Sequence, residues 1–227
     1  MTSFTDGRVP LAFDYVIFDL DGTLLDTEPV YTWATQRVLE PFGVRFSWEL
    51  KQRMMGRGAL ESARILVEAL GLDMTPEGYL AQREPLVEQA CAAAPEIAGA
   101  GGFLSALADL GLPMALATSS GKRLCDAKLA GRPWAGSFEV VVCGDDPAVA
   151  LPKPAPDIFL EAARRLGADP ARTLAFEDSP AGIAAATAAG MDVVAIADAR
   201  LERSQLVPAI AVAENFTELD AALLTGG

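Results

Sequence analysis

Residues 14–27, Asp-Tyr-Val-Ile-Phe-Asp-Leu-Asp-Gly-Thr-Leu-Leu-Asp-Thr, decide the fold. An apolar run from Tyr15 to Phe18 ends at two carboxylates, Asp19 and Asp21, and Gly22 then interrupts the pattern. A short apolar run bounded in this way predicts a buried strand of a parallel sheet. Because open α/β sheets bind ligands at the carboxyl ends of their strands, the two acids mark a candidate site.

The composition describes an ordinary globular protein with enough apolar residues for a sizeable core. The chain has 227 residues, of which 51% are hydrophobic and 22% charged, and its formal net charge is -13. This charge disfavours nucleic acid and anionic membranes, so we expect neither as a partner. The start of the chain has no apolar signal core, and the three cysteines are far apart. We therefore expect a cytoplasmic protein with reduced thiols, a monomer by default.

The sequence contains no histidine. This excludes histidine-based catalytic triads, histidine-ligated metal sites and a histidine general base. Acid–base chemistry must then fall to carboxylates, and any bound metal must be a hard ion that prefers oxygen ligands.

Between residues 29 and 96 the apolar pattern has helical spacing, and no convincing strand is found. The spacing and capping residues predict a small all-helical module inserted after the first strand. Its expected helices are Tyr31–Leu39, Trp48–Met55 after a Ser47 cap, Ala59–Leu70, and a fourth that opens at Thr75-Pro76 and breaks near Pro85.

From residue 97 onward, apolar strands alternate with helical segments, which is typical of a parallel sheet with helices on both faces. The fold class predicted is therefore α/β. The expected strands are Pro113–Ala117, Phe138–Val142, Thr173–Phe176 and Asp192–Ile196; the helices lie at Gly102–Leu110, from Gly121 to Leu129, and at Pro156–Leu166 and Ser179–Ala189.

Polar residues follow several of these strands and should meet at one edge of the sheet. They are Asp19 and Asp21, Thr118, the loop residue Lys153, and the pair Glu177-Asp178. Taken singly, most of them are more often turn residues, helix caps or solvated side chains, and Asp178 is as often a cap as a functional acid. Taken together, four crowded carboxylates need a counter-ion, and Mg²⁺ held by oxygen ligands is the natural one.

The same set also carries parts that bind phosphate. Thr118 stands where a strand opens into a helix, and Lys153 lies between two prolines that stiffen its loop. These features predict phosphoryl transfer. In this hypothesis Asp19 attacks phosphorus and forms an aspartyl-phosphate, and Asp21 protonates the leaving oxygen and later deprotonates water. Lys153 and the Thr118 loop then stabilise the phosphoryl oxygens.

Four motifs resemble those of the haloacid dehalogenase superfamily, in order and in spacing. They are Phe18-Asp-Leu-Asp-Gly-Thr-Leu24, Ala117-Thr-Ser-Ser120, Lys153-Pro-Ala-Pro-Asp157 and Phe176-Glu-Asp-Ser179. The two acids in the first motif resemble the phosphatases and mutases of the superfamily, whereas its dehalogenases lack the second acid.

The resemblance implies a three-layer Rossmann-like core, residues 1–27 and 98–227, with a helical cap over residues 28–97 that closes the site and sets specificity. It implies that Asp19, Asp21 and Lys153 are catalytic. It also implies a Mg²⁺ site of Asp19, Asp21 (through its carbonyl) and Asp178, with Glu177 a ligand directly or through water. The phosphate-binding residues it implies are Gly22, Thr118, Ser119 and Lys153.

Within the superfamily, several stretches resemble the pseudouridine-5′-phosphatase-like branch, and the chain is also similar to β-phosphoglucomutase. The stretches are Ser47-Trp48, Met55-Gly-Arg57, Leu116-Ala-Thr-Ser-Ser-Gly121 and Gly144-Asp-Asp-Pro147. The β-phosphoglucomutases use a cap histidine near the place of Tyr31, and this chain has no histidine. The favoured hypothesis is a Mg²⁺-dependent phosphatase of a small phosphorylated metabolite, a sugar phosphate or a nucleoside or pseudouridine 5′-phosphate. A phosphosugar mutase and a regulatory phosphate-binding module without turnover remain as alternatives.

A cap of this kind excludes bulk water and supplies contacts to the substrate. Its hinges are expected near Thr27–Pro29 and Ala94–Gly99. The candidate cap contacts are Tyr31, which follows the first hinge, and Arg57, which stands between Gly56 and Gly58 so that an anion can approach it.

Overall fold

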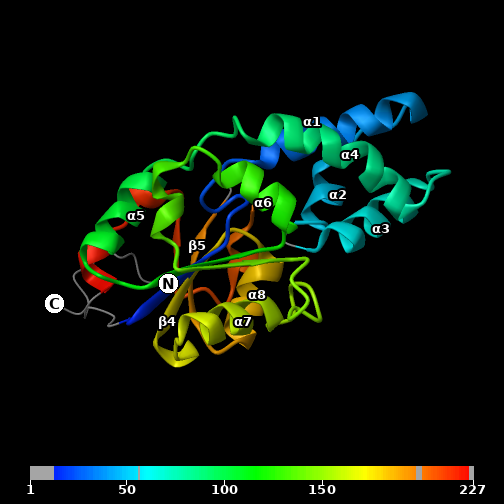
Figure 1. Ribbon diagram of the computed structural model, residues 1–227. Helices are drawn as coiled ribbons and strands as arrows, with labels where there is room; N and C mark the ends of the chain where they lie inside the picture. The colour runs from blue at the N-terminus through cyan, green and yellow to red at the C-terminus, as the bar shows by residue number, and fades with distance from the viewer. Residues whose placement is uncertain (1–12, 56, 198–200, 225–227) are drawn as a thin grey trace.

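The computed structural model describes residues 13–55, 57–197 and 201–224. The strand that opens the motif, β1 (Tyr15–Phe18), lies in the middle of a parallel sheet with the order β3-β2-β1-β4-β5-β6 (Figure 1). The other strands are β2 (Met114–Thr118), β3 (Val140–Cys143), β4 (Thr173–Glu177), β5 (Asp192–Ile196) and β6 (Ala211–Ala213). The five strands expected from the sequence are confirmed, and β6 was not expected.

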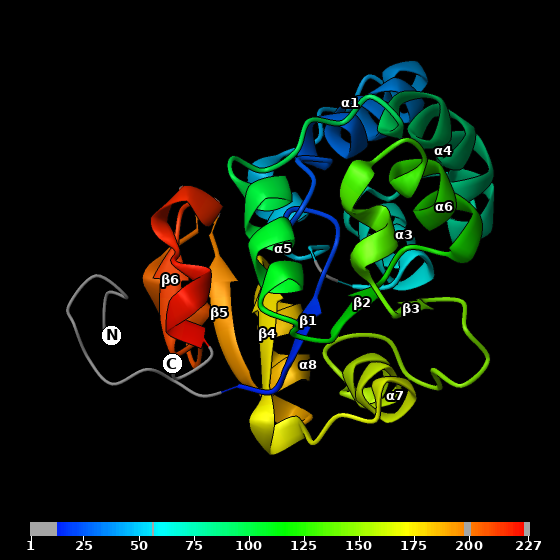
Figure 2. The ribbon, with the colours of Figure 1, turned by 60° about the vertical axis from the view of Figure 1, so that its left-hand side comes forward.

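Helices cover both faces of the sheet, which makes three layers. α7 (Asp157–Leu166) and α8 (Pro180–Ala188) pack on one face, and α5 (Ala100–Asp109) packs on the other together with short C-terminal 3-10 turns (Figure 2). The central strands are buried on both sides. Successive side chains of β1 therefore point to opposite faces of the sheet and pack into two separate cores. In one of them Phe18 stacks on Phe176 with 4.8 Å between ring centroids. The predicted α/β class with a parallel sheet is confirmed.

In the sequence, four helices come between β1 and α5. In space they lie above the carboxyl edge of the sheet (Figures 1 and 2). They are α1 (Glu28–Leu39), α2 (Trp48–Gln52), α3 (Ala59–Leu70) and α4 (Pro76–Cys91). The predicted caps form, since Ser47 accepts from Leu50 N at 3.2 Å and Thr75 from Gly78 N at 3.0 Å. The helices share an apolar cluster of their own, in which Leu66 and Tyr79 are fully buried.

The predicted break at Pro85 is wrong, because α4 runs through this residue to Cys91. Proline removes one backbone donor and crowds the carbonyl four residues earlier. Pro85 and Ala81 both lie on the exposed side of α4, so water can bind the freed carbonyl. The opposite side of α4 packs against α1 and α3, and this packing keeps the helix continuous.

The chain enters and leaves the helical segment at one place. Asp26 N donates to Pro95 O at 2.9 Å, and Ile97 N donates to Leu24 O at 2.9 Å, so the two connecting stretches run side by side. A second link is α6 (Lys122–Leu129), which follows β2 and contacts α4. None of the helices in the described ranges combines the length and apolarity needed to cross a bilayer.

Candidate active site

The acids of the first and fourth motifs meet because β1 and β4 are neighbours. Phe18 pairs with Phe176 in register, and Asp19 N donates to Phe176 O at 2.9 Å. Asp19 therefore stands beside Glu177 and Asp178 at the carboxyl edge of the sheet. Chain order reverses between β1 and β4, and this switch point is where open α/β sheets bind ligands.

Lys153 lies beneath these acids and is almost fully buried. Its Nζ donates to Asp19 Oδ1 at 2.6 Å, to Glu177 Oε1 at 2.7 Å and to the carbonyl of Ala117 at 3.1 Å. Burial alone lowers the pKa of a lysine, but the two carboxylates outweigh it and hold the pKa of Lys153 above its usual value. A single charged ammonium thus ties β1, β2 and β4 together.

The acidic group at this edge fits a divalent cation. Asp19, Glu177 and Asp178 are buried and bring carboxylate oxygens within 4.8 Å of one another. Burial raises the pKa of Asp19 to about 7, with Glu177 and Asp21 adding to the shift against the effect of Lys153. Burial and Glu177 also raise the pKa of Asp178 well above its usual value. The three acids carry more negative charge than Lys153 balances, and oxygen donors suit Mg²⁺.

Glu177 and Asp178 differ in the hydrogen bonds that they receive from the protein. Glu177 Oε2 accepts from Asp178 N and Ser179 N, each at 2.9 Å, and from Ser179 Oγ at 3.0 Å. Glu177 thus caps the start of α8 with one oxygen and binds Lys153 with the other. The hydrogen bond that Asp178 receives from Thr23 Oγ1 is long, at 3.4 Å, which leaves this carboxylate more available to a cation.

Two glycines let the backbone come close to the acids. Gly22 has a φ of +90°, and a Cβ there would lie 2.1 Å from Asp178 Oδ2. A Cβ on Gly182, in the first turn of α8, would lie 1.7 Å from Glu177 Oε1. Side chains at either position would displace an acid of the cluster, which is why the D-x-D-G spacing needs its glycine.

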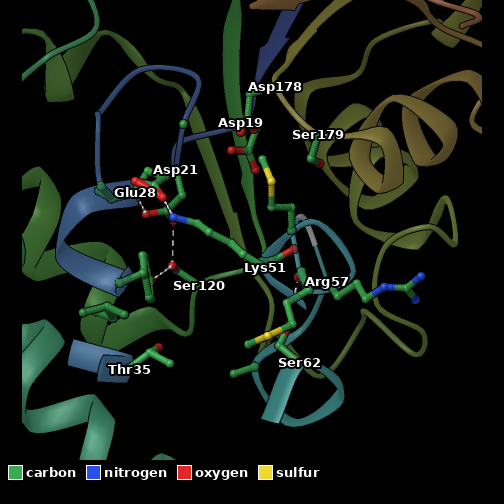
Figure 3. Close-up of a pocket in the computed structure, with 18 of the residues that line it drawn as sticks. Asp19, Asp21, Glu28, Thr35, Lys51, Arg57, Ser62, Ser120, Asp178 and Ser179 are labelled. Carbon is green, nitrogen blue, oxygen red and sulfur yellow. Dashed lines mark hydrogen bonds and ion pairs between the residues drawn. The ribbon is translucent and has the colours of Figure 1, made fainter. Parts of the chain in front are cut away.

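Asp21 points into a different cluster, away from Asp19 (Figure 3). Its Oδ1 accepts from Thr27 Oγ1 at 2.8 Å and from Lys128 Nζ, and its Oδ2 accepts from Ser120 Oγ at 2.8 Å. Burial raises the pKa of Asp21, but Lys128 and these hydroxyls outweigh it and the net pKa is lowered. Asp21 is therefore held as an ionised carboxylate.

Lys128 is a site residue that the sequence did not predict. It is fully buried in α6, and its Nζ also donates to Ser120 Oγ at 2.7 Å and to Tyr31 Oη at 2.9 Å. The carboxylate of Asp21 keeps the pKa of Lys128 above its usual value despite burial. A signal existed, since Lys128 follows Leu124 at helical spacing on the buried face of α6. A lysine on such a face needs an acidic partner.

A cavity of about 190 Å³ lies between the strand ends and the four helices (Figure 3). The strand ends and the loops after them contribute Asp19, Asp21, Gly22, Ser119, Ser120, Glu177 and Asp178 to its lining. The helical segment contributes Tyr31, Lys51, Arg57 and Arg83. The structure thus brings most of the predicted residues to one chamber. Lys153 and Thr118 lie beneath it, and Thr118 Oγ1 accepts from Ser120 N at 3.1 Å.

The two predicted contacts from the helical segment differ. Tyr31 lies at the chamber between Lys128 and Arg83, and burial raises its pKa to about 12. Arg57 borders the chamber, but its guanidinium points away from Asp19 (Figure 3) and pairs with Glu61 at 2.6 Å. Gly56, expected to help Arg57 approach an anion, lies outside the described residues.

A parallel sheet with buried acids at its switch point and a roofed chamber above them defines an α/β enzyme. The sequence matches the family described as haloacid dehalogenase-like hydrolase over residues 16–196. This chain therefore belongs to the haloacid dehalogenase-like hydrolases, as its motifs predicted.

Relatives of known name agree with this family. (DL)-glycerol-3-phosphatase 1, mitochondrial, of Arabidopsis thaliana is 40% identical over 84% of this chain, which spans 66% of that protein's length. The Drosophila melanogaster protein named "Probable pseudouridine-5'-phosphatase" is 42% identical, with 84% of each chain covered. The crystal structure of CbbY from Rhodobacter sphaeroides in complex with phosphate has the same fold, with a TM-score of 0.77 at 24% identity, covering 91% of this chain and 96% of that one.

Proposed function

We propose that this enzyme is a Mg²⁺-dependent phosphatase that hydrolyses small phosphomonoesters through an aspartyl-phosphate on Asp19. The observation that carries the proposal is the separation of the two aspartates of the first motif. Asp19 lies at the chamber floor with Lys153 on Oδ1, which leaves Oδ2 for attack on phosphorus. Asp21, two residues on, is held apart from Asp19 in the cluster of Lys128, and in this proposal it exchanges protons with the leaving oxygen and with water.

The reaction divides into two displacements at phosphorus. In the first, Asp19 Oδ2 forms a bond to phosphorus, the ester P–O bond breaks, and the leaving oxygen takes a proton from Asp21. Because Lys128 keeps Asp21 ionised in the free protein, this step requires that Asp21 take up a proton when the ester binds. In the second, Asp21 takes a proton from water, the water oxygen bonds to phosphorus, and the bond to Asp19 breaks. Inorganic phosphate and the alcohol are the products.

The remaining residues stabilise charge on the transferring group. Asp19, Asp178 and Glu177 would hold the cation, which supplies neutralisation of phosphoryl oxygens when bound. Lys153 fixes the orientation of Asp19, and Ser119 lines the chamber from the loop after β2, where it is placed to meet phosphate, while Thr118 supports this loop from beneath through Ser120 N.

The helical segment 28–97 acts in this proposal as a cap that closes over the chamber and sets specificity. Its place above the strand ends supports this role, and so does the chain's entry and exit at one place, where 24–26 pair with 95–97. The substrate class is a sugar, polyol or nucleoside monophosphate, in line with the names of the relatives. Tyr31, bonded to Lys128, occupies the place where a phosphoglucomutase would need a histidine, and this favours hydrolysis over mutase chemistry.

The test is release of phosphate from p-nitrophenyl phosphate with Mg²⁺, followed by a panel of phosphorylated metabolites that includes pseudouridine 5′-phosphate. An Asp19→Asn variant should lose activity and remain folded. The matched control is Asp14→Asn, at the opposite end of β1, where Asp14 pairs with Arg172 on the surface. Equal activity in Asp19→Asn would refute the nucleophile. Interconversion of glucose phosphates without net phosphate release would indicate a mutase, and no turnover on any ester would indicate a binding module.

A further inference from the structure

Arg83 of α4 is a buried cation at the roof of the chamber. The residue is 6% exposed, and its Cζ lies over the rings of both Tyr31 and Tyr79, 5.4 Å from each centroid. Its Nη2 pairs with Glu84, which also lines the chamber. The two rings hold the guanidinium in place before any ligand binds.

The protein leaves this guanidinium with an unmade hydrogen bond. In the described part of the chain, Arg83 Nε is the buried side-chain atom that lacks a partner. Neighbouring polar groups at the chamber are satisfied, since Thr35 and Tyr79 share a hydrogen bond at 2.8 Å and Ser62 donates to the carbonyl of Met54 at 3.0 Å. A buried donor without an acceptor is costly. Arg83 lines the chamber, so a bound molecule whose oxygen reached this nitrogen would remove that cost.

The charges around the roof indicate what kind of oxygen this is. Arg83 is paired with Glu84, and Lys51 is paired with Glu28, so the cations of this region are already matched by carboxylates. A second phosphate or a carboxylate on the substrate would need unmatched positive charge. A hydroxyl group both donates and accepts hydrogen bonds. The guanidinium of Arg83 offers it a donor, and the carboxylate of Glu84 offers it an acceptor.

The position of Arg83 relative to the reaction is also defined. Tyr31 has Arg83 over its ring, and its hydroxyl accepts from Lys128, which binds Asp21. Tyr31 and Lys128 therefore stand between Arg83 and Asp21, and Arg83 and Asp21 line the same chamber. A leaving group that extends from Asp21 into the chamber would meet Arg83.

We propose that Arg83, together with Glu84, is a specificity-determining residue that binds a hydroxyl group of an uncharged, hydroxylated leaving group. This inference rests on the phosphatase function proposed above. It assigns selection of the leaving group to α4, separate from the phosphate site at the strand ends.

The experiment compares two esters that differ only in hydroxyl groups, glycerol 3-phosphate and n-propyl phosphate, in the full-length enzyme with Mg²⁺. We expect the wild type to favour glycerol 3-phosphate in kcat/KM by about tenfold or more, the value of a hydrogen bond to a charged group. Arg83→Met and Arg83→Lys should reduce this preference to within about threefold, mainly through KM, because lysine lacks the planar fork.

Two controls separate recognition from general damage. Arg37→Met removes an exposed arginine of α1 that pairs with Glu40, and it should keep the preference of the wild type. Inhibition by inorganic phosphate should be unchanged in every variant, since phosphate binds at the strand ends. If Arg83→Met does not fold, the Arg83→Lys result decides.

Two results would overturn the inference: an unchanged preference in the Arg83 variants, or a wild-type enzyme that favours 3-phosphoglycerate, with its carboxylate, over glycerol 3-phosphate. Failure to hydrolyse any ester is a different outcome, because it would refute the phosphatase function itself.

Discussion

Asp19 and Asp21 are two residues apart, yet each is held by its own buried lysine in its own cluster. Lys153 joins Asp19 to the acids of β4, where negative charge is in excess and the pKa of Asp19 is raised to about 7. Lys128 joins Asp21 to hydroxyls of α1 and the β2–α6 loop, where the pKa of Asp21 is lowered. One motif therefore supplies two acids in opposite electrostatic environments.

Among the substitutions that test whether the two clusters act independently, Asp21→Asn should have the largest effect on turnover. We expect kcat for glycerol 3-phosphate to fall by about 10² to 10⁴, the usual worth of general acid–base catalysis. Release of p-nitrophenol from p-nitrophenyl phosphate in the first turnover should fall less, because that leaving group needs no proton. Steady-state and rapid-quench kinetics measure both values, and equal losses for the two esters would contradict the acid–base role.

Lys153→Met should disrupt the Asp19 cluster and lower both the activity and the stability of the protein. Removing one partner of a buried charged group costs about 3 to 5 kcal/mol, so the metal-free variant should unfold at much lower urea concentration. Mg²⁺ should restore part of this loss, because the cation balances the same carboxylates. Urea titrations with and without Mg²⁺ give the comparison, and an absence of any Mg²⁺ effect would argue against a cation beside Lys153.

Lys128→Met should break the other cluster with a smaller effect, about 2 kcal/mol, since Asp21 is partly exposed and keeps its bonds from Thr27 and Ser120. Mg²⁺ should not restore this loss. The matched control is Lys122→Met on the same helix, whose lysine is exposed and pairs with Asp126. If Mg²⁺ rescued Lys128→Met as well as Lys153→Met, the two clusters would not be independent.

The pH dependence of stability should have opposite signs for the two aspartates. In the metal-free protein, folded Asp19 keeps its proton up to about pH 7, whereas the unfolded chain loses it near 3.8. Stability from this group therefore falls as pH rises through that window. Asp21, with a lowered pKa, contributes stability above 3.8 that is lost as pH falls.

Mg²⁺ should thus stabilise the protein more at about pH 8 than at about pH 5, because at the lower pH it competes with protons. Thermal unfolding at the two pH values, with Mg²⁺ or with a chelator, measures the difference. A larger Mg²⁺ effect at the lower pH would contradict the assignment of Asp19 to the cation cluster.

The sequence predicted the sheet edge well because strand ends and acids are local signals. Asp19, Lys153, Glu177 and Asp178 meet as the parallel topology requires. Strand β6 was missed because Ala-Val-Ala carries little strand signal, and the break at Pro85 was wrongly expected because packing by α1 and α3 overrides a local rule.

The roof of the chamber was predicted less well. Lys128 and Arg83 act across long sequence separations, and their partners Asp21 and Tyr31 are found only once α6 and α4 are packed. Arg57 looked accessible between two glycines, but Glu61 in the first turn of the next helix, α3, is its partner. Charges on helices depend on tertiary neighbours, which single-sequence patterns do not contain.

The central claim is that Asp19 takes the phosphoryl group while Asp21, in its separate cluster, moves protons. The most direct measurement mixes the Asp21→Asn variant with p-nitrophenyl phosphate and Mg²⁺, quenches in acid, and locates phosphate by peptide mass spectrometry. We predict a burst of about one p-nitrophenol per site and a phosphoryl group on the peptide that contains Asp19, because hydrolysis of the intermediate needs Asp21. Release of p-nitrophenol with no phosphoryl group on that peptide would contradict the account.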